Sequence, residues 1–250
     1  MKRLLVLLAL LPSLAGAQLA SREWGKSAGV HRIHAKAEFL AGLPMGPFAN
    51  LPNGNLVTVE DADNAQHALV SADDGKTWTK HALFAQPAQF RVSYERALIC
   101  TRDGVVIVAF MNLVERAGWA WNPEIHDSPN AKLPTYVMRS PDGGRTWEAP
   151  QKLHDDWTGA IRDMVELTDG TVVFTSQMML HNPGRHAVVT YASKDKGQSW
   201  QRSNVIDLGG IGHHDGAIEP ASSSAGTDTS GCSCARTGAG CGRRSRLTRA

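Results

Sequence analysis

The sequence contains few cysteines for its length, and their positions argue against stabilisation by disulfides or metals. Of the four cysteines, Cys100 lies alone in an apolar run, whereas Cys232, Cys234 and Cys241 lie near the C-terminus. Their spacing matches neither a disulfide framework nor a zinc site. The sequence therefore predicts a buried free thiol at Cys100, and we expect neither a metal nor a cofactor.

The sequence also lacks a strong excess of charge of one sign. The formal net charge is +2. This excess comes from the two ends, because Lys2 and Arg3 open the chain and five arginines against one aspartate follow Pro220. The residues between the ends are mildly acidic. We therefore expect no basic face and no nucleic-acid partner.

A long hydrophobic run is absent as well. The chain opens MKRLLVLLALLPSLAGAQ, in which two cations precede a short leucine-rich run and Ala15-Gly16-Ala17. The run is too short to span a bilayer, and this order of features is typical of a cleaved export signal. We predict a signal peptide at 1–17, an exported (periplasmic or secreted) protein, and no membrane association after cleavage.

What the sequence does contain is a motif that occurs three times. The copies are SADDGKTW (71–78), SPDGGRTW (140–147) and SKDKGQSW (193–200), and the shared pattern is S-x-D-x-G-x-[ST]-W. The aspartate carboxylate can accept hydrogen bonds from N–H groups of its own turn, and glycine can adopt the positive φ of the turn. The pattern predicts hairpin turns whose tryptophans pack on a neighbouring strand.

A second repeat precedes each copy of this motif. The stretches NLPNGNLVTV, ICTRDGVVIVAF and VELTDGTVVFTS each contain an Asn-Gly or Asp-Gly turn and then a β-branched apolar run. Such a stretch predicts a hairpin that leads into a buried strand. No convincing amphipathic helix follows the N-terminal segment. Repeated short strands with one turn motif per unit indicate an all-β fold, a β-propeller in which each unit is a four-stranded blade.

The S-x-D-x-G-x-T-W motif resembles the Asp box, or BNR repeat, of sialidases (neuraminidases). The arrangement is similar to the sialidase-type six-bladed β-propeller over about Ala37 to Pro220, and it implies a glycoside hydrolase. Asp boxes lie on the rim of such propellers and also occur in non-enzymatic ones. We therefore interpret Asp73, Asp142 and Asp195 as fold residues. The segment 18–220 is then a partial propeller with three blades and the start of a fourth.

The composition changes abruptly after Pro220. Leu247 is the one large aliphatic residue of the remaining chain, which has no aromatic residue. A reading frame shifted near Ala221 permits an Asp-Gly turn and an apolar run in the register that a fourth blade requires. We interpret 221–250 as a disordered tail that results from a frameshift, and the chain as truncated.

The central axis of a propeller, where the innermost strand of each blade begins, is the expected position of an active site. Counting back eight or nine residues from the turn glycines places three pairs there, namely Met45/Gly46, Glu95/Arg96 and Ile161/Arg162. In the shifted reading frame, the fourth unit adds Glu219. Charged residues at the start of apolar strands need a reason. We predict that Arg96 and Arg162 bind a substrate carboxylate. The alternative is a salt bridge with a neighbouring acidic residue, namely Glu95, Asp163 or Glu166.

The resemblance implies two catalytic carboxylates. Sialidases use three arginines on the substrate carboxylate, a tyrosine nucleophile activated by a glutamate, and an aspartate acid/base. Glu219, in GAIEPA, is similar to that glutamate, which removes the phenolic proton. Asp63 matches the place of the acid/base, and Asp61 is a close alternative. Both aspartates can also be interpreted as solvated loop carboxylates.

The chain departs from the family pattern at two points. No arginine lies near Pro44–Met45, where the first arginine of the family is expected. The later arginines and the tyrosine belong to blades that this chain lacks. The tyrosines that are present, Tyr94, Tyr136 and Tyr191, lie in the wrong blades to act as the nucleophile.

Two further groups of residues are candidates for contact with a sugar. His213 and His214 precede Glu219 on a loop expected to face the pocket, where they can form hydrogen bonds with a substrate. Inter-strand loops contain tryptophans that either stack on a sugar ring or pack over the propeller face. These tryptophans are Trp119, Trp121 and Trp157.

Together these observations predict an exported, exo-acting, sialidase-like glycoside hydrolase. Its partner is a carbohydrate with a terminal acidic sugar such as sialic acid. An open fan of blades exposes strand edges, so we expect the truncated chain to fold only in part and to be inactive. The alternatives are a non-catalytic carbohydrate- or protein-binding propeller and a polysaccharide lyase that uses the same residues.

Overall fold

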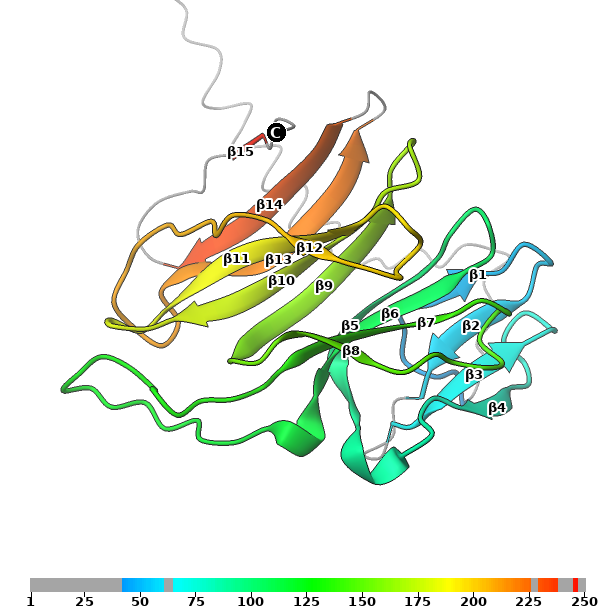
Figure 1. The fold of residues 1–250 in the computed structure, drawn as a ribbon, viewed down its shortest axis with the longest axis horizontal. Helices are drawn as coiled ribbons and strands as arrows, with labels where there is room; N and C mark the ends of the chain where they lie inside the picture. The colour runs from blue at the N-terminus through cyan, green and yellow to red at the C-terminus, as the bar shows by residue number, and fades with distance from the viewer. Residues whose placement is uncertain (1–41, 61–64, 226–228, 238–244, 247–250) are drawn as a thin grey trace, which may run out of the picture. The chain divides into compact units, whose positions relative to one another are not determined.

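The computed structural model describes residues 42–60, 65–225, 229–237 and 245–246. In these residues the regular structure is almost entirely β-strand (Figure 1), with two short 3-10 helices, η1 (Pro87–Gln89) and η2 (Leu113–Glu115). Neither helix of the described part has the length and apolar character needed to cross a membrane. The signal peptide predicted at 1–17 and the loop aspartates Asp61 and Asp63 lie outside the described residues.

Three antiparallel meanders follow one another along the chain, each with its strands in sequence order. The first contains β1 (Ala49–Asn50), β2 (Leu56–Val59), β3 (His67–Ser71) and β4 (Thr79–Ala82). The second contains β5 (Val92–Cys100), β6 (Val106–Asn112), β7 (Thr135–Ser140) and β8 (Gln151–His154). The third contains β9 (Thr158–Glu166), β10 (Val172–Leu180), β11 (Arg185–Ser193) and β12 (Gln201–Arg202). The third meander is part of a seven-stranded sheet, in which β13 (Gly216–Ala225) pairs in parallel with β11. Successive antiparallel meanders of four strands are propeller blades, so the predicted partial all-β propeller is confirmed.

The blades pack face to face, and the sequence of β6 shows why. Every residue of β6 is buried, and successive side chains of a strand point to opposite faces of the sheet. One set of β6 side chains packs with the first blade, namely Val106, Val108 and Phe110. The alternate set packs with the third blade, namely Ile107, Ala109 and Met111. A strand that is apolar at successive positions requires an apolar neighbour on each face, and the adjacent blades provide both.

The predicted Asn-Gly and Asp-Gly turns connect the first two strands of each blade. Gly54, Gly104 and Gly170 have φ values of 86°, 83° and 84°, a region that L-residues with side chains rarely adopt. The N–H of each glycine donates to the carbonyl oxygen three residues earlier, at 2.9, 2.8 and 3.0 Å respectively. The turn geometry therefore explains why glycine occupies these positions.

The three Asp-containing motifs connect the third and fourth strands of each blade. Asp142 accepts hydrogen bonds from the Thr146 N–H at 2.9 Å and from the Thr146 hydroxyl at 2.6 Å. The Ser140 hydroxyl donates to Asp142 at 2.8 Å and accepts from the Gly144 N–H at 2.8 Å. The same pattern recurs around Asp73 and Asp195. These aspartates therefore stabilise their own turns.

The tryptophan of the motif joins its turn to the interior between two blades. Trp147 donates from Nε1 to the Gly144 carbonyl at 3.0 Å, and its ring packs against the apolar cluster shared by the first two blades. Trp200 donates to the Gly197 carbonyl at 3.2 Å and packs against the cluster shared by the second and third blades. The predicted packing of the motif tryptophans on neighbouring strands is confirmed for this pair.

The described part of the chain after Pro220 differs from the irregular tail that we expected. β13 (Gly216–Ala225) continues through Pro220, β14 (Thr229–Thr237) pairs with β13, and β15 (Ser245–Arg246) pairs with β14. The start of β13 is anchored by the buried Ala217, which packs against Val188 of β11. The frameshift itself concerns the gene and stays a prediction.

Replacing Ser140 by alanine tests the motif as a stabilising unit. The change removes the acceptor of the buried Gly144 N–H, and an unsatisfied buried donor costs about 1–3 kcal/mol. S140A should lower the free energy of unfolding by that amount, measured by urea unfolding followed by circular dichroism. Thr79 is exposed on β4, and the control T79A should change the free energy by less than about 0.5 kcal/mol. Equal losses in both variants would contradict the assigned role of Ser140.

The same hydrogen bonds make stability depend on pH. The Thr77 hydroxyl, the Thr77 N–H and the Ser71 hydroxyl lower the pKa of Asp73 from 3.8 to about 2. Because the pKa is lower in the folded state, the contribution of Asp73 is complete above about pH 4 and is lost as the pH falls toward about 2. Wild type and D73N should therefore differ in unfolding free energy near neutral pH and converge in acid. Urea titrations at several pH values measure this, and a pH-independent difference would count against it.

Candidate active site

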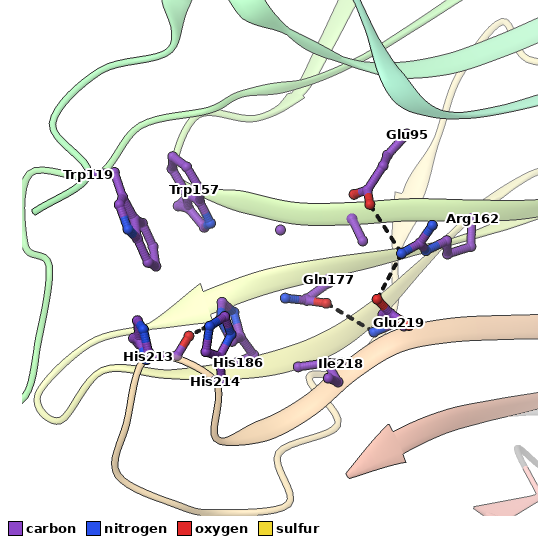
Figure 2. Close-up of a pocket in the computed structure, with 12 residues that line it drawn as sticks. Glu95, Trp119, Trp157, Arg162, Gln177, His186, His213, His214, Ile218 and Glu219 are labelled. Atoms are coloured by element: carbon purple, nitrogen blue, oxygen red, sulfur yellow. Dashed lines mark hydrogen bonds and ion pairs between the residues drawn. The ribbon is translucent and has the colours of Figure 1, made fainter. Parts of the chain in front are cut away.

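A pocket of about 230 Å³ lies where segments far apart in the sequence meet. Residues from β5, β9, β10, β11 and β13 line it, together with residues from three loops. Figure 2 shows Glu95, Arg162 and Glu219 on one side. The opposite side contains aromatic rings, those of Trp119, Trp157 and His213.

Arg162 lies between two carboxylates. Its Nη2 atom is 3.1 Å from Glu95 Oε1 and 2.9 Å from Glu219 Oε1. Because both oxygens contact the same nitrogen, they can be no farther apart than the sum of these distances. The three side chains remain partly exposed. The pocket therefore holds two acids and one cation within reach of a single small ligand.

Glu95 has a perturbed pKa in this group. Burial, the largest effect, raises the pKa of Glu95 above its usual value of 4.5, the Arg162 charge lowers it, and the Glu219 charge raises it. The net shift is upward. A carboxyl group with a raised pKa keeps its proton to higher pH, which is the property required of a general acid.

Glu219 reaches Arg162 from an irregular point of β13. The pairing of β13 with β14 shifts register between Ile218 and Ala221, and Glu219 has a φ of 48°. Positive φ is uncommon for residues other than glycine, and bulges beside active sites redirect side chains. The Glu219 N–H donates to Gln177 Oε1 at 3.0 Å. The bulge thus directs the carboxylate of Glu219 toward Arg162 and Glu95.

The aromatic side of the pocket depends on the long connection between β6 and β7. The rings of Trp119 and Trp157 have centroids 4.4 Å apart, and Trp157 is buried. The connection is held in place by the buried Asp127, whose Oδ1 lies 2.8 Å from Nδ1 of His181. Large amphipathic rings at the edge of a polar pocket combine apolar contact area with a polar N–H group. This surface is suited to the face of a sugar ring.

A hydrogen bond to the backbone places the histidine pair of the pocket. His186 Nε2 donates to the carbonyl oxygen of His213 at 2.7 Å. Burial lowers the pKa of His186, which favours the neutral ring. The ring of His213 also contacts Trp121, at 5.7 Å between centroids, and His214, at 4.0 Å.

The structure brings together four of the six site residues proposed from the sequence. Arg162, Glu219, His213 and His214 line one pocket. Asp63, the proposed acid/base, lies outside the described residues, as does its alternative Asp61.

Arg96 does not line this pocket. Its side chain is buried, and its guanidinium donates to the carbonyl oxygens of Met45 and Val59 at 3.3 and 2.7 Å. Neighbouring residues of a strand point to opposite sides, so that Glu95 rather than Arg96 faces the pocket. The proposed pairing of Arg96 with Arg162 on one substrate carboxylate is therefore not formed here, and the alternative salt bridge of Arg162 with Glu95 is present.

No tyrosine of the described residues lines the pocket. Tyr136 donates to Glu115 Oε1 at 2.6 Å. Tyr191 is stacked on Phe174 in the core, and burial raises the pKa of Tyr191 to about 12. These rings support the fold and are not placed for nucleophilic attack in the pocket.

Glu95 and Gln177 are among the site residues that were not proposed from the sequence. Glu95 was considered only as a partner for Arg162, although it occupies the start of an inner strand. Gln177 was missed, and the available signal was a polar residue inside the apolar run VVFTSQMML. Its role depends on a contact with Glu219 across 42 positions of sequence.

Metal ligands and thiols do not form a second candidate site in the described part of the chain. There, no group of three or more His, Cys, Asp or Glu side chains is arranged to hold a metal ion. Cys100 is a free thiol that is half-buried rather than fully buried, and burial raises its pKa.

Comparisons with known proteins agree with this fold. The family described as BNR repeat-like domain matches residues 69–248. A sialidase from Bacteroides fragilis (strain YCH46) is 28% identical over 206 residues, which are 70% of this chain but only 37% of that protein. This chain thus spans little more than a third of that curated relative.

Two solved structures are similar to this chain, and the first of them shares its fold. A protein of unknown function from Dyadobacter fermentans DSM 18053 has a TM-score of 0.54 and 18% identity, over 77% of this chain and 62% of its own. A Trypanosoma rangeli sialidase in complex with 2,3-difluorosialic acid has a TM-score of 0.49 and 19% identity, over 78% and 34% respectively. The match of the family to more than half of the sequence, together with the repeated motifs and blades, establishes that the chain belongs to the BNR repeat-like domain family.

Proposed function

We propose that the pocket around Arg162 is the active site of a sialidase-type glycoside hydrolase that releases a terminal sugar. The observation that carries the proposal is the placement of Glu95 and Glu219 on one arginine nitrogen. Two neighbouring carboxyl groups in different environments are the usual apparatus of glycoside hydrolysis. Sialidases use a tyrosine nucleophile instead, and in this proposal a carboxylate takes its place because no tyrosine of the described residues lines the pocket. The similarity to a curated sialidase supports the same reaction class.

In this proposal the two glutamates have different roles. Glu95 donates its proton to the glycosidic oxygen as the bond from that oxygen to the anomeric carbon breaks. The Glu219 carboxylate stabilises the positive charge that develops on the sugar, or bonds to the anomeric carbon. Water then gives a proton to the Glu95 carboxylate and attacks the anomeric carbon, which releases the sugar and restores both glutamates. Arg162 contacts both carboxyl groups through one nitrogen and thereby orients them. Glu95 thereby takes the role that the sequence suggested for Asp63.

An acidic sugar such as sialic acid is the substrate that we propose. Its support is the Arg162 guanidinium, a donor suited to a carboxylate, and the curated relative that is named a sialidase. Because Arg96 binds backbone carbonyls instead, this specificity rests on a single arginine of the described residues. A panel of fluorogenic sialosides, uronides and neutral glycosides tests it. Turnover of neutral glycosides alone would keep the hydrolase and reject the acidic substrate.

A non-catalytic carbohydrate-binding propeller is the second candidate. The specific observation in its favour is the Trp119–Trp157 pair, which provides apolar contact area beside the polar group. Saturable binding of a sugar without turnover on the whole glycoside panel would support this function instead.

Export and the reading frame complete the proposal. We propose export on the N-terminal segment, and N-terminal sequencing of the mature protein should then begin at Gln18.

We also propose that turnover requires the frame restored at Ala221, because the ring of blades is otherwise open. The nucleotide sequence beyond codon 221 tests this directly.

Glu219 provides the sharpest mutational test of the hydrolase. In the form of the protein that turns over a substrate, E219Q should lower kcat/KM about 10²- to 10⁴-fold, because an amide cannot supply the charge. Glu148 gives a matched control, since it pairs only loosely with Arg139 at 3.7 Å outside the pocket. E148Q should retain wild-type kcat/KM. Full activity of folded E219Q in the fluorogenic assay would reject the proposed role.

The raised pKa of Glu95 predicts the pH dependence. A general acid acts only while protonated, so kcat/KM should fall as the pH rises through the pKa of Glu95. In E95Q most of the activity should be lost, and the remaining kcat/KM should no longer fall at high pH, so that the alkaline limb of the profile disappears. Profiles of kcat/KM against pH for wild type, E95Q and D63N distinguish the acids. Loss of the limb in D63N, with an unchanged limb in E95Q, would assign the proton to Asp63.

A further inference from the structure

Gln177 is a buried polar residue in the middle of the third blade. It lies on β10 among buried neighbours, and its side chain lines the pocket. Its Oε1 atom accepts the Glu219 N–H at 3.0 Å. Among the described strands, β13 has ladder partners in β11 and β14 but not in β10. The hydrogen bond between Gln177 and Glu219, drawn in Figure 2, therefore joins two strands that have no backbone pairing with each other.

The backbone at Glu219 requires outside support. Glu219 precedes Pro220, and a residue before proline favours extended conformations with negative φ. Its observed φ is 48°. The pairing register of β13 passes from Ile218 to Ala221, so that the ladder with β14 omits Glu219 and Pro220. Strained conformations of this kind persist when surrounding contacts fix them.

A second side chain of β10 holds the other side of the same bulge. The buried Thr175 donates from Oγ1 to the Pro220 carbonyl at 3.0 Å. Thr175 and Gln177 are two positions apart in a strand, which places them on the same face. We call these two residues the β10 pair. Gln177 accepts a hydrogen bond from the Glu219 N–H at the first residue of the bulge. Thr175 donates a hydrogen bond to the Pro220 carbonyl at the second.

Gly159 on β9 provides the space for the Gln177 amide. A Cβ atom at Gly159 would lie 2.2 Å from Gln177 Nε2 and 2.7 Å from Gln177 Cδ. Distances this short exclude a side chain unless the amide moves. The φ of Gly159 is not in the left-handed region, so glycine is required here for space rather than for backbone conformation.

We propose that Gln177, in the space left by Gly159 and together with Thr175, is a positioning residue that holds Glu219 in its bulged conformation against Arg162. The structural part concerns the chain itself, whereas the consequence for catalysis rests on the function proposed above. Gln177 acts through the Glu219 backbone and takes no part in proton transfer.

Crystal structures of wild type and Q177M provide the direct test. Methionine has a similar length but no acceptor for the Glu219 N–H. In Q177M, Glu219 should leave positive φ, and the distance from its carboxylate to Arg162 Nη2 should exceed about 4 Å. Q177E keeps an acceptor oxygen and should preserve the bulge. Gln198 is exposed on the rim, and Q198M is the matched control. A bulge and ion pair retained in Q177M would overturn the proposal, whatever the activity.

Kinetics separate positioning from a general effect on stability. In the form that turns over a substrate, Q177M should lower kcat about 10²-fold, the effect of a displacement near 1 Å, with KM unchanged. Q177E should recover most of kcat. G159A should lower kcat by about as much as Q177M does, and the double variant should have nearly the same kcat as Q177M, because both changes displace the same amide. A kcat that stays at the wild-type value in folded Q177M would contradict the proposal.

Two outcomes keep the proposals distinguishable. If wild type hydrolyses no glycoside but Glu219 moves in Q177M, the proposed function fails and the positioning role stands. If Q177M does not fold, T175V removes the hydrogen bond to the Pro220 carbonyl with little change of volume, and T175S restores it. T175V should then displace the bulge, and an unchanged bulge in T175V would reject the β10 pair as its support.

Discussion

Packing of each blade against its neighbours is the constraint on which the rest of the structure depends. In the second blade both faces of β6 are buried, because alternate residues of this strand enter two different apolar clusters. Such a sheet is stable only between two others. This stacking brings the starts of the inner strands β5 and β9 together with β13, although their sequences are far apart. The pocket is thus a consequence of the same burial that forms the core.

The two ends of β11 have separate roles. At its C-terminal end, Ser193 begins one of the Asp-containing turns, whose hydrogen bonds are satisfied within the motif. At its N-terminal end, His186 lines the pocket and holds the carbonyl of His213. The most recognisable residues of the sequence therefore stabilise the rim, while the residues proposed for chemistry lie at the other end of the strands.

The pocket combines a strained backbone with an unusual arrangement of charge. Two glutamates share one arginine, and one of the glutamates has a positive φ that ordinary strand pairing does not produce. Strain of this kind tends to accumulate at functional sites, where surrounding contacts fix it. Here the buried polar side chains of β10 supply those contacts. Stability of the third blade and orientation of Glu219 are therefore linked through the same residues.

The sequence by itself determined the local features of this protein. The turn motifs, the glycines with positive φ and the blade-like order of strands follow from short-range patterns, since hydrogen bonds of a turn join residues close in sequence. Arg162 and Glu219 were also found, because the position of an inner strand can be counted from its turn. Tertiary structure decided which side chains of those strands face the pocket. In the folded chain Glu95 faces the pocket, whereas Arg96 binds backbone carbonyls away from it. Gln177 contacts Glu219 in the space beside Gly159, and no local spacing in the sequence encodes these contacts.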